Sequence, residues 1–432
     1  MLRRVGIVTL AAIVALGALA TGQESLYFLV FLTAVIILAA YLVARRGLVD
    51  LQAGSWLERG QATAGEVLTI TYTLRNTAWL PKPWLEVTSP STLPMAIPGR
   101  VVSLAPRTAR TWAARVSLTE RGQFRIDPMV VRTGDPLGLF ESVASVGPGS
   151  GVLVYPRVEG LSGWRIPSSP LEGSESSAAR GPHATPLVTS VRPYTPGDAF
   201  NRIHWRSSAR HQELQVKEFD IEQTADLWII LDLDRARHAG SGPRATIETG
   251  VRAAASLAEH ALAEGRNVGL EAHGLRRVTI GADRGPRQRH KIMGLLAVAQ
   301  PDGRVPVGEL LAQRAGRLRR GTVTVVITPS LDQGWIGGLG DYRRRGAPVV
   351  ACIIDPTFTP MDVRSAGRPV PPPGADDATP SSSGPDAPLR ALRALRHALE
   401  EHDVQTHMLL PDVPLGEQIR SAHPASRALV AR

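Results

Sequence analysis

Two apolar segments without any charged residue lie near the start of the chain, at residues 5–20 and 26–43. The second is long enough to cross a bilayer as a helix, because about 20 apolar residues span the roughly 30 Å hydrocarbon core. The first is short by this measure. The pattern predicts a transmembrane hairpin within residues 1–46, with spans at about 5–21 and 26–43.

The charges that flank these segments predict their orientation. Glu24 is the one charged residue of the connector, and the arginines outside the pair are Arg3, Arg4, Arg45 and Arg46. Because positive charge stays on the cytoplasmic side, both ends of the hairpin and the globular part are expected in the cytoplasm, at the inner or plasma membrane. The first segment also resembles a signal peptide that could be cleaved at Ala18-Leu19-Ala20. Such cleavage would leave the globular part cytoplasmic as well.

Residues 50–160 carry the two-residue period of half-buried strands. In VLTITYTLRN, apolar residues alternate with threonines, and TWAARVSL repeats the alternation. Clusters of Pro and Gly separate these runs. Several short strands of this kind are typical of an antiparallel sandwich. We predict an immunoglobulin-like β-sandwich domain at residues 50–160.

The pattern changes in residues 225–432. The apolar run DLWIILDLD is typical of a strand buried on both faces. Segments of helical spacing then alternate with further apolar runs, which predicts a mostly parallel sheet with helices on both faces. Residues 365–388 are rich in Pro, Ser and Gly and predict a disordered surface loop in this α/β domain. Residues 161–224 are expected to be a linker that contains a distinctive charged stretch.

The composition adds a strong bias towards arginine. The formal net charge is +10, and of the 49 lysine and arginine residues only Lys82, Lys217 and Lys291 are lysine. Together with abundant Ala, Gly and Pro, this bias is typical of a GC-rich genome, so the basic character does not by itself indicate a polyanion-binding surface. Cys352 is the single cysteine, which excludes an internal disulfide.

Polar residues follow two of the predicted strands of the α/β domain. Asp232 and Asp234 end the first strand, and Thr328 and Asp332 follow a later one. Open α/β sheets place their sites at the carboxyl ends of strands, and these oxygen-bearing side chains are candidates for holding Mg²⁺ there. The alternative is that they cap the helices that follow.

The stretch RPYTPGDAFNRIHWRSSAR, residues 192–210, combines a turn with a short charged helix. TPGD is typical of a turn, and Asp198 is expected to cap the helix. Three arginines on one face of this helix repel one another, and three acids follow on a predicted strand. The arginines are Arg202, Arg206 and Arg210, and the acids are Glu218, Asp220 and Glu222. We expect ion pairs between the two sets, which would make the stretch a clasp between the β and α/β domains.

Two other interpretations of this stretch have less support. Residues 192–222 hold five basic and five acidic side chains. A phosphate-binding surface keeps its positive charges free, so nucleic acid is not an expected partner. His204 is a candidate general base, but it lacks a serine or cysteine motif beside it.

The same residues resemble the core signature of the domain-of-unknown-function family 58. The matching positions are Arg192, Tyr194, Gly197, Asp198, Arg202, Ile203, Trp205, Ala209, Arg210, Leu214, Val216, Lys217 and Glu218. The upstream ERGQFRIDP and GDPLGLF are similar to the lead-in of that family, in which a double membrane span is also common. The resemblance covers nearly the whole chain.

This resemblance implies a C-terminal half like a von Willebrand factor A domain and a working link to a MoxR-type AAA+ ATPase. The metal motif of such A domains is Asp-x-Ser-x-Ser. Here the corresponding positions are Asp232, Asp234 and Ala236, so both serines are missing, which puts metal binding in doubt. The resemblance implies no catalytic residue.

Two functional hypotheses follow. The first is a membrane-anchored, non-enzymatic scaffold or partner of the ATPase, acting in the assembly or maturation of envelope or membrane complexes. Its partner-binding surface would be Asp232, Asp234 and Asp332, whose charge favours a basic counterpart. The second is a hydrolase or other enzyme that uses His204 or the Asp232/Asp234 pair.

Overall fold

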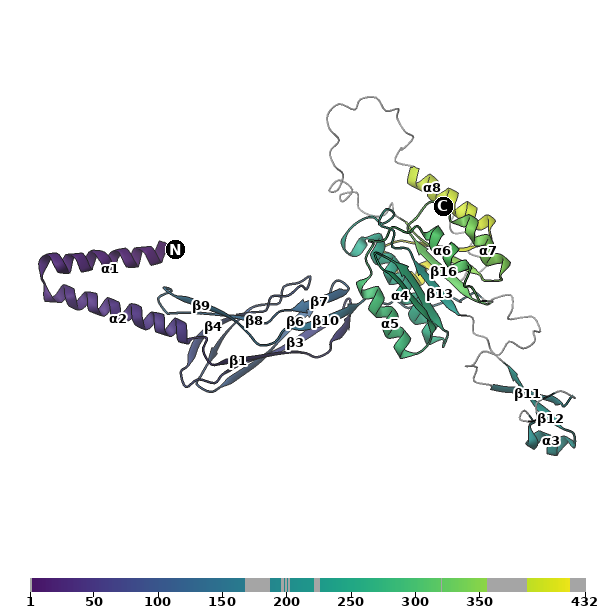
Figure 1. The fold of residues 1–432 in the computed structure, drawn as a ribbon, viewed down its shortest axis with the longest axis horizontal. Helices are drawn as coiled ribbons and strands as arrows, with labels where there is room; N and C mark the ends of the chain where they lie inside the picture. Colours follow the sequence, from purple (N-terminus) through teal and green to yellow (C-terminus); the bar gives the residue numbers. More distant parts are fainter. Residues whose placement is uncertain are drawn as a thin grey trace, which may run out of the picture. The chain divides into compact units, whose positions relative to one another are not determined.

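The computed structural model describes most of the chain as two compact units, Met1–Arg157 and Val158–Arg432 (Figure 1). The described residues are 2–167, 187–195, 198, 200, 203–220, 226–319, 321–355 and 387–419. Most of the predicted loop at 365–388 therefore lies outside the described residues.

The first unit begins with two helices that lie side by side, α1 (Leu2–Thr21) and α2 (Glu24–Arg46) (Figure 1). Among the described residues, α2 alone is long and apolar enough to cross a membrane, with a hydropathy of 2.7. The apolar part of α1, Ala12–Thr21, is shorter. Large apolar side chains of α2 are exposed, for example Phe28 at 67%, so α2 does not have the burial of a core helix. A span in α1 stays a prediction.

Ten strands follow in three sheets that share one apolar core. The sheets have the strand orders β1-β3-β6, β2-β10-β7 and β5-β4-β8-β9. The strands are β1 (Leu51–Leu57), β2 (Gln61–Thr63), β3 (Val67–Asn76), β4 (Lys82–Thr88), β5 (Arg100–Leu104), β6 (Ala109–Ser117), β7 (Gly122–Ile126), β8 (Met129–Gly134), β9 (Glu141–Val146) and β10 (Ser150–Tyr155). All pairs are antiparallel except β2 with β10. The predicted alternation is confirmed in β3, whose even-numbered residues Leu68 to Leu74 are buried.

A buried lysine joins the end of α2 to the β region. Lys82 at the start of β4 is only 3% exposed. Its ammonium donates hydrogen bonds to the carbonyl oxygens of Arg46, Gly47 and Val49, at 3.3, 2.9 and 2.7 Å. The last carbonyls of a helix have no partner within the helix and carry partial negative charge, so a cation there is stabilising. Burial nevertheless lowers the pKa of Lys82 from its ordinary value, an effect that Asp50 opposes.

The second unit is built on a six-stranded sheet of order β15-β14-β13-β16-β17-β18. Its strands are β13 (Leu227–Leu231), β14 (Val268–His273), β15 (Arg277–Asp283), β16 (Val323–Thr328), β17 (Val349–Ile354) and β18 (Gln405–Leu409). All neighbours are parallel except the edge strand β15, which pairs antiparallel with β14. The prediction of a mostly parallel sheet is therefore confirmed.

Helices cover both faces of this sheet, as alternating strands and helices require. The helices are α4 (Thr246–Ala263), α5 (Pro286–Val298), α6 (Val307–Ala315), α7 (Leu339–Arg344), α8 (Ala387–Glu401) and α9 (Leu415–Gln418). One face packs against α6, α7 and α8, with Ile230, Val326 and Ile353 in that core. The opposite face meets α4, where a Cβ on Gly250 would lie 3.1 Å from Ile354 and 3.3 Å from Leu231.

Two boundaries predicted from the sequence are wrong. The last two residues of the loop predicted at 365–388 belong to α8, which begins at Ala387. Pro388 does not prevent this, since proline is well tolerated in the first turn of a helix. The linker predicted from residue 161 is also contradicted at its start, because Leu161 and Trp164 are both 2% exposed and Ile166 is 6% exposed.

Candidate functional site

The site lies where β13 and β16 end. These strands are parallel neighbours, with Leu231 beside Ile327, so the residues that follow them meet at one edge of the sheet. Asp232 extends the pairing by donating its backbone N–H to the carbonyl of Ile327 at 2.9 Å. The structure thus brings together the four predicted residues Asp232, Asp234, Thr328 and Asp332.

Asp232 is fully buried and held by its own chain. The Thr328 hydroxyl donates to Asp232 Oδ2 at 2.6 Å, and the backbone N–H of Asp234 donates to Oδ1 at 2.9 Å. Thr328 is fully buried too, and its oxygen accepts from the Ser330 N–H at 2.9 Å. Burial raises the pKa of Asp232, although these hydrogen bonds oppose the shift. The hydrogen bonds of Asp232 therefore connect the two strand ends. Its side chain has no exposed surface that a partner protein could contact.

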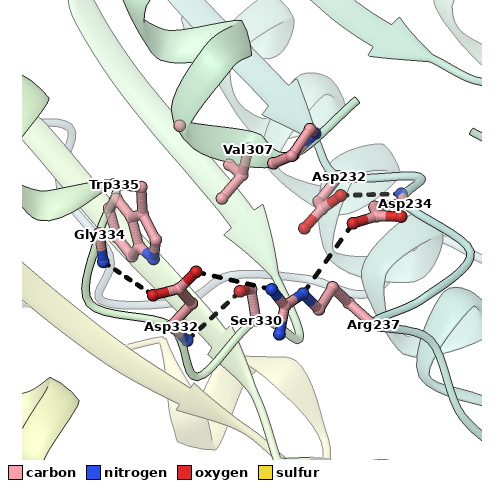
Figure 2. Close-up of a pocket in the computed structure, with 10 residues that line it drawn as sticks. Asp232, Asp234, Arg237, Val307, Ser330, Asp332, Gly334 and Trp335 are labelled. Atoms are coloured by element: carbon pink, nitrogen blue, oxygen red, sulfur yellow. Dashed lines mark hydrogen bonds and ion pairs between the residues drawn. The ribbon is translucent and has the colours of Figure 1, made fainter. Parts of the chain in front are cut away.

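An arginine lies between the other two acids (Figure 2). Arg237 places Nε 3.9 Å from Asp234 Oδ2 and Nη2 3.5 Å from Asp332 Oδ2. Asp234 also accepts from the Ala236 N–H at 3.1 Å, and Asp332 accepts from the Gly334 N–H at 2.9 Å. The side chain of Asp332 is 56% exposed, whereas that of Asp234 is 10% exposed. Of the three predicted partner-binding acids, Asp332 is the one that faces solvent.

These residues line a pocket of about 120 Å³ (Figure 2). The remaining lining comes from the start of α6 and from the loop after β16, and it comprises Pro306, Val307, Gly308, Ser330, Gly334 and Trp335. Gly308 permits this packing, because a Cβ there would lie 3.1 Å from Trp335 Cβ. The volume suits a side-chain head group and is small beside a cofactor site, which typically has about 300 Å³ or more.

The residues present do not fit a magnesium site. Mg²⁺ needs several oxygen ligands in octahedral geometry, and both oxygens of Asp232 already accept hydrogen bonds. Ala236 offers no side-chain oxygen, and the guanidinium of Arg237 already supplies the positive charge beside Asp234 and Asp332. Within the described part of the chain, no cluster of three His, Cys, Asp or Glu residues could hold a metal ion.

A half-buried histidine contacts the backbone of the site. His238 places Nε2 2.9 Å from the carbonyl oxygen of Asp232 and Nδ1 3.0 Å from the hydroxyl of Thr246, at the start of α4. Burial lowers the pKa of His238, and the same cause lowers the pKa of His273 and His407. All three imidazoles therefore favour the neutral form in the folded second unit.

These histidines predict that the second unit loses stability in mild acid. In the unfolded chain these histidines bind protons below their ordinary pKa of about 6.5. In the folded unit their pKa values are lower, so they stay neutral to a lower pH. The free energy of unfolding therefore falls as the pH drops below about 6.5. Asp232 acts in the opposite direction, because burial raises its pKa. In the Asp232→Asn variant, which removes that group, we expect a lower unfolding temperature for the second unit at about pH 5.5 than at about pH 7.5. Calorimetry of the full chain would measure it.

The first unit is the internal control for this measurement. None of the 11 histidines lies within residues 1–157, so its transition should move much less over the same range. Equal shifts of both transitions would contradict a histidine origin.

In the signature stretch, Arg192 forms an ion pair with Asp198 that the sequence did not predict. Strand β11 (Leu187–Pro193) pairs antiparallel with β12 (Gln215–Asp220), and α3 (Trp205–His211) lies between them in sequence. Arg192 grips Asp198 with two hydrogen bonds of 2.8 Å, and Asp198 also accepts from the N–H and hydroxyl of Thr195. These contacts hold the pKa of Asp198 well below its usual range.

The prediction that Asp198 caps the helix is wrong. His204 is the N-cap of α3, and its Nδ1 accepts from the Ser207 N–H at 3.2 Å and lies 2.7 Å from the Ser207 hydroxyl. Asp198 is already engaged by the forked guanidinium of Arg192, which is among the stronger hydrogen-bonding partners of a carboxylate.

The predicted clasp stays a prediction. Arg202, Glu222 and the side chains of Glu218 and Asp220 lie outside the described residues. Arg206 and Arg210 are described and exposed. The signature position Gly197 is also outside the described part, whereas Tyr194 stacks near Phe200 with ring centroids 6.0 Å apart.

Sequence reasoning missed several residues that make up the site. Ser330, in the stretch TPSLD, was overlooked although it directly follows a predicted strand end. Arg237, His238 and Trp335 carry no local signal, because only the tertiary structure brings them beside Asp232 and Asp332. Lys82 lies in the first unit and is not part of this site. It did carry a signal in the sequence, since a lysine is unusual in a chain so rich in arginine.

Two sequence comparisons find similar proteins. Residues 190–359 match the family model described as "Protein of unknown function DUF58". The chain is 27% identical over 317 residues to "Uncharacterized protein YeaD" of Bacillus subtilis (strain 168), which covers 71% of this chain and 77% of that protein.

Solved structures resemble smaller parts of the chain. The CARDB domain of the PF1109 protein from Pyrococcus furiosus, crystallised with di-metal ions, is 16% identical with a TM-score of 0.20, and covers 24% of this chain and 92% of its own. Proximal thread matrix protein 1 from the mussel byssus is 10% identical with a TM-score of 0.24, and covers 30% of this chain and 38% of its own. The sequence match is the finding that identifies a family: residues 190–359 of this chain are similar to the DUF58 family model.

Proposed function

We propose that this chain is a membrane-anchored, non-enzymatic partner of a MoxR-type AAA+ ATPase, which it recruits for the assembly or maturation of envelope or membrane complexes. The observation that carries the proposal is the state of the strand-end site. Its buried acid, Asp232, is engaged by hydrogen bonds from its own chain, while Asp332 and Arg237 stand half exposed at the pocket. Such an arrangement suits recognition of a protein surface better than proton transfer.

The other candidate groups for chemistry support the same view. Burial raises the pKa of the Cys352 thiol to about 12, which disfavours the reactive thiolate. The Mg²⁺ that Asp232 and Asp234 would need finds no suitable ligand set. The link to the ATPase itself rests on the family resemblance, which also favours a C-terminal domain of the von Willebrand factor A type.

The anchor in this proposal is α2, preceded by α1 as a second span. The arginines at both outer flanks, at positions 3, 4, 45 and 46, favour a cytoplasmic location for the globular part. A cytoplasmic ATPase would then meet the strand-end site directly. Protease added to spheroplasts would test the topology, because a cytoplasmic globular part survives until lysis.

Asp332→Asn is expected to weaken association with the ATPase by about fivefold, and by more at low salt, because an exposed charge pair contributes up to about 1 kcal/mol. The substitution keeps Oδ1 as the acceptor for the Gly334 N–H and removes only the charge. Interferometry with the full chain in nanodiscs, at two salt concentrations, would measure the change.

The matched control is Asp341→Asn, which neutralises an exposed acid on α7 that pairs with Arg344 and does not line the pocket. If Asp332→Asn binds as well as the parent, the strand-end surface is not the contact. If the parent chain binds no ATPase at all, the recruitment function is wrong.

One contact favours the alternative, a hydrolase that uses His204. The 2.7 Å separation between His204 Nδ1 and the Ser207 hydroxyl is that of a base and a nucleophile. The same nitrogen accepts from the Ser207 N–H, however, so helix capping accounts for the contact. We expect His204→Asn to preserve stability and function, because asparagine is a good N-cap but no general base. A selective loss of function in this folded variant, measured by complementation of a deletion strain, would favour the enzyme.

A further inference from the structure

The pocket beside Asp332 holds a buried donor that no residue satisfies. Trp335 is 4% exposed and lines the pocket, and its indole Nε1–H has no hydrogen-bond partner among the described residues. Figure 2 shows the indole nitrogen on the side of the ring that faces Asp332. A buried donor left unpaired costs about 1–3 kcal/mol, so this N–H favours a ligand with an acceptor such as a peptide carbonyl.

The charge of the lining favours a cation. Two carboxylates of the lining, on Asp234 and Asp332, lie beside the one guanidinium of Arg237. The third acid of the lining, Asp232, is buried and already accepts hydrogen bonds at both oxygens. An incoming carboxylate would meet the exposed charge of Asp332, and like charges at this range repel. A lysine ammonium or an arginine guanidinium would instead find an exposed carboxylate with a free approach from solvent.

Arg237 itself is held loosely. Its distances of 3.9 and 3.5 Å to the two acids exceed those of a good hydrogen bond, and its side chain is 42% exposed. It can therefore leave Asp332 without breaking a tight pair. Arg237 occupies the position at which a cation of a partner would form a closer ion pair with Asp332.

We propose that the pocket binds one basic residue of a partner peptide, whose cationic head displaces Arg237 from Asp332 while a carbonyl of the same peptide accepts from the Trp335 indole N–H. This rests on the proposed function for the identity of the partner, and it names the chemical group that the partner inserts. The volume of about 120 Å³ accommodates such a head group.

The proposal makes predictions of opposite sign for two neighbouring residues. Asp332→Asn removes the anchor and should weaken binding of a basic peptide by about fivefold, whereas Arg237→Gln removes the competitor and should tighten binding by a similar factor. A pocket for an acidic group would show the reverse order. Trp335→Phe keeps an aromatic ring and removes the donor, and should weaken binding of the basic peptide.

The test uses the full chain in nanodiscs with ¹⁵N-labelled tryptophan indoles, and Trp335→Phe assigns the resonance of Trp335. The probes are the capped tripeptides acetyl-Gly-Arg-Gly-amide, its citrulline analogue, which has the same shape without the charge, and its glutamate analogue. We expect the arginine peptide to shift the Trp335 resonance saturably, citrulline to do so more weakly, and glutamate to leave it unchanged.

A shift by glutamate but not by arginine, or tighter binding of the arginine peptide to Asp332→Asn, would overturn the inference. Because the titration needs no ATPase, its outcome is separate from that of the recruitment function. Binding of the ATPase without any response to the arginine peptide would refute this inference alone. A response to arginine in a chain that binds no ATPase would refute the proposed function alone.

Discussion

Replacing Asp232 with alanine is expected to lower the free energy of unfolding of the second unit by about 2–6 kcal/mol, because it leaves two buried donors without an acceptor at about 1–3 kcal/mol each. The donors are the Thr328 hydroxyl and the Asp234 N–H. Calorimetry or denaturant unfolding of the full chain, followed by probes in the second unit, would measure this loss.

A double-mutant cycle separates the contact from general damage. Thr328→Val removes the hydroxyl, and the double variant should be less unstable than the sum of the single variants, since both remove the same contact. Asp332→Asn is the control, because that side chain is 56% exposed and should change stability little. Additive losses would show that Asp232 and Thr328 contribute separately.

This expectation also bears on the partner surface. Because Asp232 has no exposed area, its replacement can affect the proposed binding of an ATPase only by changing the shape of the strand ends. Loss of binding in a fully folded Asp232 variant would therefore require a rearranged pocket, which the Trp335 indole resonance would report.

The second large effect is expected at Lys82, in the first unit. Lys82→Met should lower the free energy of unfolding of that unit by about 2 kcal/mol or more, because three backbone carbonyls at the end of α2 each lose a hydrogen bond. Of the three, the carbonyl of Arg46 still accepts from the Val49 N–H at 3.3 Å. The methionine retains the apolar stem and spares the cost of burying a charge, so the loss is smaller than three unpaired groups would imply. Unfolding of the full chain in detergent, monitored by hydrogen exchange in β4 and β8, would detect it.

Lys291→Met is the matched control. It makes the same chemical change at an exposed position of α5, and its effect should be within about 0.5 kcal/mol. An unchanged first unit in Lys82→Met would mean that water replaces the ammonium at the three carbonyls.

The sequence alone determined the elements whose burial repeats along the chain. The alternation in VLTITYTLRN predicted β3 because each second side chain enters the core, and the apolar run before Asp232 predicted β13 because both faces of that strand are covered. Strand ends in a parallel sheet meet at one edge. It was therefore also predictable that four residues lie close together there, namely Asp232, Asp234, Thr328 and Asp332.

Only the tertiary structure decided what these residues do. Asp232 and Thr328 are 96 positions apart, and Lys82 reaches back 36 positions to Arg46, distances over which periodicity carries no information. The sequence predicted Asp198 as a helix cap. In the folded chain its carboxylate instead accepts two hydrogen bonds from the guanidinium of Arg192. The cation beside Asp234 and Asp332 is likewise the chain's own Arg237, because the turn after β13 brings that side chain back across the strand ends.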